Sequence, residues 1–203
     1  MAQVREFAAA VLREYPRLDV LVNNAGIWLP GERQVSADGH ELQFAVNYLS
    51  GFLLTRTLLP LIVKSAPARI VNVASGLQSP IDFTDVMLTR PGRAAQGYAQ
   101  SKLAQVMFTF DLARELQDTR VIVAALHPAT MMDTTLVRAT GMPAQSTVAE
   151  GAEAVMNLIT SRGIQSGRYY DRLRPARAQA QAYDDEARAK LEALSRELTG
   201  VAD

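Results

Sequence analysis

Three short apolar runs, each rich in β-branched residues, most constrain what this chain can fold into. They span Leu18–Val22, Arg69–Ala74 and Arg120–Leu126. Continuous apolar runs of this length are typical of strands buried on both faces of a parallel sheet. Stretches with helical periodicity lie between the runs. The sequence therefore predicts an α/β fold with a parallel sheet and right-handed crossovers.

The helical stretches carry apolar residues at spacings of three and four. One ends at Pro16, and another is expected to run from Ser36, as its N-cap, to about Lys64, with a bend near Gly51 or Pro60. A loop with a short helix is expected over residues 76–97. The remaining predictions are helices over 98–113, 145–161 and 176–198, a last strand over 167–171, and packing of the final helix on its own chain.

Composition excludes several classes of function. The 203 residues fit one domain, 1–203, and the 21 basic residues equal the 21 acidic ones, so nothing favours nucleic acid. The absence of cysteine suits a cytoplasmic protein, and two histidines make a metal site unexpected. No apolar run approaches the ~20 residues of a membrane span, so none is expected. The N-terminus does not resemble a signal peptide.

Polar residues follow each predicted strand. Asn23, Ser75 and His127 stand directly at or after the ends of the three apolar runs. In open parallel sheets, ligands bind beyond the carboxyl ends of the strands. The sequence therefore predicts a binding site at that edge of the sheet.

Tyr98 and Lys102 are four residues apart, so they share a face of the predicted helix. An ammonium beside a phenol favours the phenolate, and we expect it to lower the pKa of Tyr98 toward neutrality. Ser75 at a strand end can donate a hydrogen bond to the same substrate oxygen. Taken alone, such a Tyr–Lys pair is more often a partly buried tyrosine with a solvated lysine.

The ordered set of motifs is more specific than the pair. Asn23-Asn24-Ala25-Gly26, then Asn47, Ser75 and Tyr98-x-x-x-Lys102, resembles the short-chain dehydrogenase/reductase family. The resemblance implies a Rossmann-type domain that interconverts a carbonyl and an alcohol with NAD or NADP. It implies that Tyr98 is the acid or base, that Lys102 binds the nicotinamide ribose, that Ser75 orients the reacting oxygen, and that Asn47 holds a water linked to the lysine.

The resemblance also implies a set of cofactor-binding residues. His127-Pro128-Ala129-Thr130 matches the family segment that meets the nicotinamide, with Ala129 where glycine is usual. Residues 131–147 would form an apolar lid over a small hydrophobic substrate, or their apolar side chains only pack this loop against the domain. Asp82-Phe83 and the long interval between Ser75 and Tyr98 resemble the retinol-dehydrogenase and protochlorophyllide-reductase-like branch. The implied cofactor-binding residues are Asn23, Ala25, Gly26, Tyr98, Lys102, Pro128 and Thr130.

The Gly-rich turn that binds pyrophosphate in the family does not precede these motifs. The expected fold is therefore an N-terminally truncated Rossmann-type sheet with helices on both faces. Three hypotheses follow: an oxidoreductase, a non-catalytic remnant that acts as a binding or dimerisation module, and an enzyme completed by another polypeptide. We expect the chain alone to bind NADH or NADPH weakly or not at all, and to aggregate or dimerise through the edge of Leu18–Val22.

Overall fold

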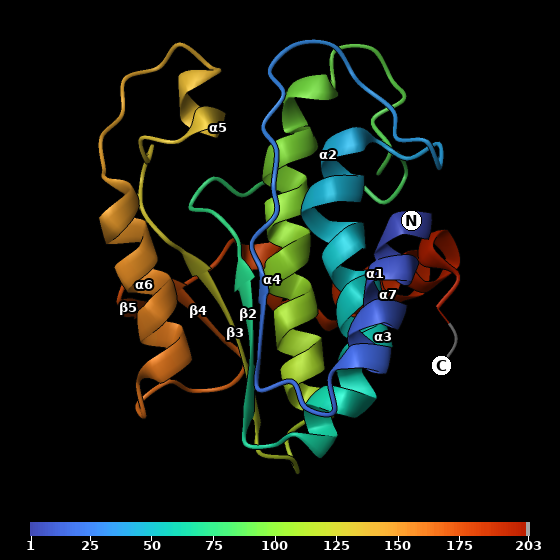
Figure 1. Cartoon of the computed structure of the whole chain (residues 1–203). Coiled ribbons are helices and arrows are strands. Elements are labelled where there is room, and N and C mark those ends of the chain that lie inside the picture. Colours follow the sequence, from blue (N-terminus) through green and yellow to red (C-terminus); the bar gives the residue numbers. More distant parts are fainter. Residues whose placement is uncertain (202–203) are drawn as a thin grey trace.

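A five-stranded sheet forms the centre of the molecule, as the computed structural model shows for residues 1–201 (Figure 1). The strand order is β1-β2-β3-β4-β5. The first four strands are parallel and β5 runs antiparallel to β4. The α/β prediction is confirmed. The strands are β1 Val20–Asn23, β2 Ala68–Val73, β3 Val121–His127, β4 Arg168–Asp171 and β5 Arg174–Ala176.

Helices cover both faces of this sheet. Helices α3 and α4 pack on one face and α6 on the other, while α1 packs on α3 and α7 on α4 (Figure 1). The α-helices are α1 Ala2–Glu14, α2 Leu42–Phe44, α3 Ser50–Lys64, α4 Gly97–Glu115, α5 Thr135–Arg138, α6 Val148–Thr160 and α7 Asp185–Thr199, with short 3-10 helices at Ala94–Gln96 and Ala180–Tyr183.

The three crossovers between parallel strands do not share one hand. From β1 to β4, each new strand lies next to the preceding one and extends the sheet at the same edge. The first two crossovers pass over one face through α3 and α4, and the third passes over the opposite face through α6. The prediction of right-handed crossovers throughout is therefore wrong for at least one of them.

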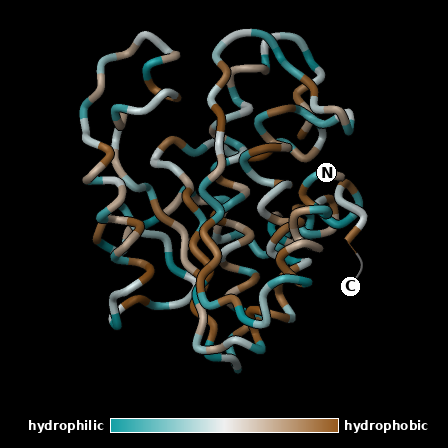
Figure 2. Tube along the Cα trace, in the orientation of Figure 1, coloured by the Kyte–Doolittle hydropathy of each residue, from teal (hydrophilic) through white to brown (hydrophobic). Residues whose placement is uncertain are grey.

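The central strands β2 and β3 are largely apolar because both of their faces are covered. In β3, Val123 and Ala125 belong to the core cluster under α4, whereas Ala124 and Leu126 belong to the cluster under α6. Figure 2 shows hydrophobic residues along these central strands. This alternation explains why a continuous run, rather than a pattern of alternating polarity, marked the strand in the sequence.

The helix predicted from Ser36 begins later. Its first residue is Leu42, and the carboxylate of Glu41 caps it by accepting hydrogen bonds from the backbone N–H groups of Gln43 and Phe44. Ser36 instead closes a turn, in which its backbone N–H donates to the carbonyl of His40. Ser36 as an N-cap was wrong, because a local turn satisfies its backbone before the helix starts.

This helix is irregular at Ala45–Leu49, where a π-helical turn joins α2 to α3. The irregularity precedes Gly51 and Pro60, near which a bend was predicted. By length and composition, the helix from Leu42 to Lys64 could cross a membrane, which corrects the expectation that no segment is long enough. Such a helix is weak evidence for a span, since the core helices of globular proteins pass the same test, and Phe52 and Leu58 of this one are buried in the core.

The C-terminal region differs from its prediction at both ends. The strand over 167–171 is followed by β5, so it is not the last one, and the final helix begins at Asp185 rather than Ala176. Asp184 caps this helix through the N–H groups of Glu186 and Ala187. Strand β5 has three residues, all of them exposed, and a proline at its centre. It therefore left no periodic signal in the sequence.

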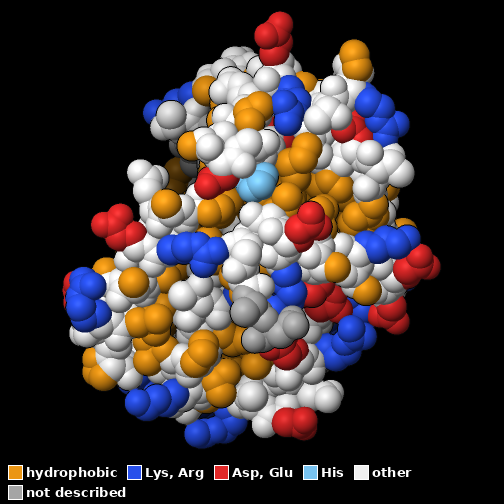
Figure 3. Space-filling model, turned by 90° about the vertical axis from the view of Figure 1, so that its right-hand side faces the viewer, with side chains coloured by type: hydrophobic (Ala, Val, Ile, Leu, Met, Phe, Trp, Pro, Cys, Tyr) orange, Lys and Arg blue, Asp and Glu red, His pale blue; other side chains and the backbone are white. Residues whose placement is uncertain are grey.

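Helix α7 packs on its own chain, as predicted. Leu191 is 1% exposed, and the hydroxyls of Tyr48 and Ser195 lie 2.7 Å apart in a buried hydrogen bond. Arg56 of α3 forms an ion pair with Glu192 at 2.8 Å. Figure 3 views the side of α1 and α7, where hydrophobic side chains reach the surface between charged ones.

Candidate functional site

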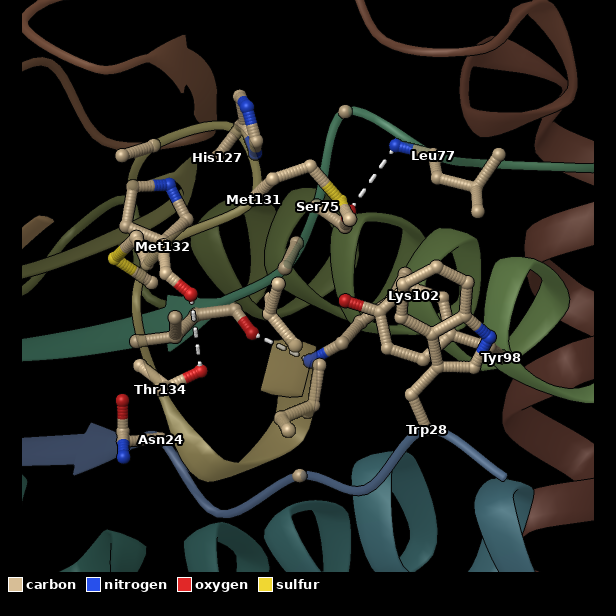
Figure 4. Close-up of a pocket in the computed structure, with 18 of the residues that line it drawn as sticks. Asn24, Trp28, Ser75, Leu77, Tyr98, Lys102, His127, Met131, Met132 and Thr134 are labelled. Atoms are coloured by element: carbon tan, nitrogen blue, oxygen red, sulfur yellow. Dashed lines mark hydrogen bonds between the residues drawn. The ribbon is translucent and has the colours of Figure 1, made fainter. Parts of the chain in front are cut away.

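The carboxyl ends of β1, β2 and β3 open into one pocket of about 730 Å³, a size typical of small-molecule sites. The start of α4 supplies one wall and the segment around α5 another (Figure 4). Its lining is mostly apolar. The pocket contains Asn24, Ala25, Gly26, Ile27, Trp28, Val46, Val73, Ala74, Ser75, Gly76, Leu77, Tyr98, Lys102, His127, Pro128, Ala129, Thr130, Met131, Met132, Thr134, Leu136 and Val137.

Tyr98 and Lys102 lie on the first two turns of α4 and both face this pocket. The Lys102 Nζ lies 5.6 Å from the centre of the Tyr98 ring. It donates hydrogen bonds to the carbonyl of Val73 at 2.8 Å and to Oε1 of Gln105 at 3.0 Å. The lysine is 4% exposed, and this burial lowers its pKa to about 7. Burial therefore disfavours the charged form of Lys102.

The pKa of Tyr98 moves in the opposite direction from the prediction. Burial raises the pKa of its phenol, and hydrogen bonding with Ser75 counteracts only part of that effect. Lys102 is not among the causes of the shift. The expected lowering by the ammonium was wrong, because the amine is directed to Val73 and Gln105 and its own burial disfavours the charged form.

Ser75 stands directly beyond β2 and is 8% exposed. Its Oγ accepts a hydrogen bond from the N–H of Leu77 at 3.1 Å, which fixes the side chain beside the phenol (Figure 4). Gly76 follows, and a Cβ there would lie 3.4 Å from the ring of His127. Gly76 therefore lies against His127, where the ends of β2 and β3 line the pocket.

Asn47 lies on the π-helical turn, behind the pocket wall rather than in it. Its Oδ1 accepts from the N–H of Ile27 at 2.7 Å, and its Nδ2 donates to the Ile27 carbonyl at 3.0 Å and to Oγ of Ser101 at 2.9 Å. Asn47 therefore ties the chain after β1 to α4 next to Lys102. A water between Asn47 and the lysine stays a prediction.

The residues of the Asn-Asn-Ala-Gly segment do not all line the pocket. Asn24, Ala25 and Gly26 line the pocket, whereas Asn23 is buried behind it. The Nδ2 of Asn23 donates to Oγ1 of Thr55 at 2.9 Å and to Oδ1 of Asn72 at 2.8 Å. The structure therefore places Asn23, a predicted cofactor-binding residue, in a hydrogen-bond network that joins β1, β2 and α3.

Asn72 is the centre of that network, because its own Nδ2 donates to Oγ1 of Thr109 on α4 at 2.8 Å. We expect Asn72→Ala to lower the free energy of unfolding by about 1–3 kcal/mol, since buried partners on both sides lose a hydrogen bond. Urea denaturation measures the change. The matched control is Asn24→Ala, an exposed asparagine, which should stay within about 0.5 kcal/mol of the native protein. Equal effects of the two variants would contradict the role of the network.

The segment after β3 reaches the pocket as expected. Pro128 and Thr130 both line it, and Oγ1 of Thr130 lies 3.1 Å from Nε2 of His127. Burial lowers the pKa of His127, against the opposing charge of Asp171. Of the predicted lid, Met131, Met132, Leu136 and Val137 line the pocket, whereas Met142 is 49% exposed and lies outside it.

Sequence reasoning did not single out several residues of the pocket. Trp28 lies against Tyr98, with ring centres 5.3 Å apart and planes inclined by 30°. Leu77 also lines the cavity, as does Thr134, which falls within the predicted lid. The single tryptophan of the chain, placed two residues after Gly26, was a signal that could have been used. Among residues 1–201, no group of three or more His, Asp or Glu side chains could hold a metal ion.

Comparison with known proteins finds one family model and several relatives that match this chain. The family model described as short chain dehydrogenase matches residues 1–145. Human retinol dehydrogenase 13 is 37% identical over 99% of this chain, and human retinol dehydrogenase 14 is 37% identical over 99%. The chain spans 66% and 64% of the length of these two relatives.

Solved structures share the fold. An uncharacterised protein from Mycobacterium paratuberculosis matches with a TM-score of 0.79 and 28% identity, over 98% of this chain and 72% of that one. The RhlG/NADP active-site complex of Pseudomonas aeruginosa matches with a TM-score of 0.63 and 26% identity, over 84% and 70%. NADPH-bound carbonyl reductase from chicken fatty liver shares the fold with a TM-score of 0.64, 23% identity and coverage of 88% and 73%.

Proposed function

The chain belongs to the short-chain dehydrogenase family, in its retinol-dehydrogenase-like branch, and on this basis we propose that it interconverts an apolar carbonyl compound and its alcohol with NAD or NADP. The observation that carries the proposal is the convergence of Tyr98, Ser75 and Lys102 in one largely apolar pocket. These three side chains come from α4 and from the end of β2.

The residues present fit a nicotinamide coenzyme. Lys102 is a buried hydrogen-bond donor at the floor of the pocket, and Gly26 leaves room beside it, since a Cβ there would lie 3.4 Å from Nζ. Ala25, Gly26, Lys102, Pro128 and Thr130 would hold the nicotinamide and its ribose. The coenzyme would supply the hydride to the carbonyl carbon.

Proton transfer would fall to Tyr98. A phenol is protonated at neutral pH, so Tyr98 would donate its proton to the oxygen of a carbonyl that is being reduced, although burial raises the pKa of this phenol and weakens it as an acid. Ser75 would donate a hydrogen bond to the same oxygen and orient it. Lys102, with a pKa near 7, can return a proton to the phenol after each turnover.

The substrate class follows from the other walls. Met131, Met132, Leu136 and Val137 close the pocket with apolar surface, and methionine adapts to varied shapes. Among the residues that line the pocket, Lys102 is the one lysine or arginine and no aspartate or glutamate occurs. A hydrophobic aldehyde, ketone or alcohol therefore suits the site better than a sugar or a charged acid. The cytoplasmic location remains a prediction.

One observation favours the alternative of a binding module. In the described residues β1 pairs only with β2, and Phe7 and Leu12 of the neighbouring α1 are 58% and 45% exposed. An open strand edge beside apolar surface favours association with another chain. A second copy of this chain and another polypeptide would both fit a binding module of this kind. With a second copy, the assembly is a homo-oligomer.

The test is coenzyme-dependent reduction of a long-chain aldehyde. NADH and NADPH are each titrated calorimetrically into the purified protein, and their oxidation in the presence of decanal is followed at 340 nm. The proposal expects binding of at least one coenzyme and turnover that depends on the aldehyde. Binding of neither coenzyme, together with a stable dimer in size-exclusion chromatography, would favour the binding module instead.

A further inference from the structure

Gln105 is a buried polar residue that the reaction chemistry leaves unexplained. It lies on α4, three residues after Lys102, and is 3% exposed. Its neighbours Ala104 and Val106 are buried apolar residues. A buried amide lowers stability unless it is hydrogen-bonded. Its Oε1 accepts a hydrogen bond from Nζ of Lys102 at 3.0 Å, so the partner of Gln105 is a residue of the pocket.

The backbone of Gln105 has a separate partner. Its carbonyl accepts a hydrogen bond from the hydroxyl of Thr109 at 2.8 Å, and Nδ2 of Asn72 donates to the same hydroxyl. This backbone bond does not need the side-chain amide. Replacement of the side chain therefore removes the contact with Lys102 and leaves the network around Asn72 in place.

Two oxygen atoms fix the direction of Nζ in Lys102. One is the carbonyl of Val73 at the end of β2, at 2.8 Å, and the other is Oε1 of Gln105. On another side Nζ faces Gly26, where a Cβ would lie 3.4 Å away. An ammonium has three N–H donors, so two protein acceptors leave the third position for the pocket. In the neutral amine that position is a lone pair.

Neither of these two acceptors carries a charge. Burial lowers the pKa of Lys102 to about 7, with no charged side chain among the causes. Of the other described residues that line the pocket, only Tyr98 and His127 titrate. A carboxylate at hydrogen-bond distance would stabilise the ammonium, whereas an amide oxygen accepts the same bond and favours the ammonium far less.

We propose that Gln105 is a positioning residue for Lys102: its amide oxygen and the carbonyl of Val73 hold Nζ so that its third position faces the coenzyme ribose. The proposal rests on the proposed function, in which Lys102 contacts that ribose. Glutamine suits this role because glutamate would hold the amine as an ammonium, and an apolar side chain would leave a buried donor unpaired. The amine thus stays oriented in both of its protonation states.

Titration of the amine by NMR tests this contact without coenzyme. The chain has three lysines, and Lys64 and Lys190 are exposed, so lysine labelled with carbon-13 at Cε gives one buried signal and two surface signals. Gln105→Met keeps the length of the side chain and removes the acceptor, so Lys102 should titrate at a lower pH. Gln105→Glu keeps an oxygen and adds a charge, so the titration should move up by about 1–3 pH units.

The matched control is Gln100→Met, which replaces another buried glutamine of α4, whose Nε2 donates to the carbonyl of Val86 at 2.7 Å. It should lower stability but leave the titration of Lys102 at its native pH. An unchanged titration in Gln105→Met would overturn the proposal, and so would an equal displacement in Gln100→Met. If Gln105→Glu does not fold, the comparison of the two methionine variants still decides.

Coenzyme binding gives the second readout. The calorimetric Kd for NADH or NADPH should rise about three- to tenfold in Gln105→Met, because the amine loses one of the two bonds that direct it. Gln105→Glu, which keeps an acceptor, should restore most of the affinity. An equal rise in Gln100→Met would overturn the proposal. If the native protein binds neither coenzyme, the proposed function fails, while the NMR titration still decides whether Gln105 holds Lys102.

Discussion

Replacement of Tyr98 by phenylalanine should lower kcat/KM for carbonyl reduction by about 10²–10⁴-fold. The substitution removes one hydroxyl and leaves the ring that packs against Trp28 and Lys102. A phenol is protonated at neutral pH, so under the proposed function the lost group is the proton donor itself. Steady-state kinetics with NADH or NADPH and decanal measures the change.

The control for this variant is Tyr15→Phe, which removes a phenolic hydroxyl from a side chain that is 57% exposed at the end of α1. It should leave both kcat/KM and Tm at their native values. The Tm of Tyr98→Phe should also stay within a few degrees of the native one. Turnover by Tyr98→Phe within a factor of ten of the native rate would remove Tyr98 from the role of proton donor.

The second large effect concerns Lys102 and the dependence of stability on pH. Burial lowers the pKa of its amine from 10.5 to about 7, so between these values the unfolded chain binds a proton that the folded chain does not. The free energy of unfolding therefore rises with pH across this window, and the penalty of burying the charge is fully present below pH 7. Lys102→Met keeps a side chain of similar length and abolishes this dependence.

The measurement is the difference in unfolding free energy between the native protein and Lys102→Met, obtained by urea denaturation at several pH values. The native protein should gain about 2 kcal/mol relative to the variant between pH 7 and pH 9. Other titrating groups cancel in the difference. Lys64→Met, which replaces an exposed lysine of α3, is the matched control. A difference that does not change with pH would show that the amine stays charged in the folded protein.

The parts of the fold that the sequence predicted are those in which local pattern and tertiary environment agree. The run at Arg120–Leu126 became β3 because both of its faces are covered, and Leu18–Val22 became β1, in which Leu21 is buried and Val20 and Val22 are partly buried. The pair Tyr98 and Lys102 was predictable for the same reason, since helical spacing alone places both on one face of α4.

The failures occurred where several local solutions compete. Ser36 has the chemistry of an N-cap, yet it closes a turn, and Glu41 caps the helix instead. The strand β5 has three residues and an exposed proline, so neither periodicity nor apolarity marks it. The hand of the crossover through α6 depends on which face of the sheet is open to that helix, which no window of sequence reports.

The candidate site was predicted in its residues but not in their interactions. The direction of the Tyr98 pKa depended on where Nζ of Lys102 points, and that in turn depended on Gln105 and the carbonyl of Val73. Asn23 and Asn24 are the same residue type at adjacent positions. Asn23, the last residue of β1, points into a buried hydrogen-bond network, whereas Asn24, directly after the strand, lines the pocket.

The π-helical turn at Ala45–Leu49 has a consequence for how the molecule opens. Consecutive residues of this turn bind to distant parts of the chain: Asn47 to Ser101, beside Lys102, and Tyr48 to Ser195 of α7. Local unfolding in proteins proceeds in cooperative units rather than residue by residue. We therefore expect this turn to couple α4 to α7 in one such unit, so that fraying of α7 should reach the pocket although α7 contributes no residue to it.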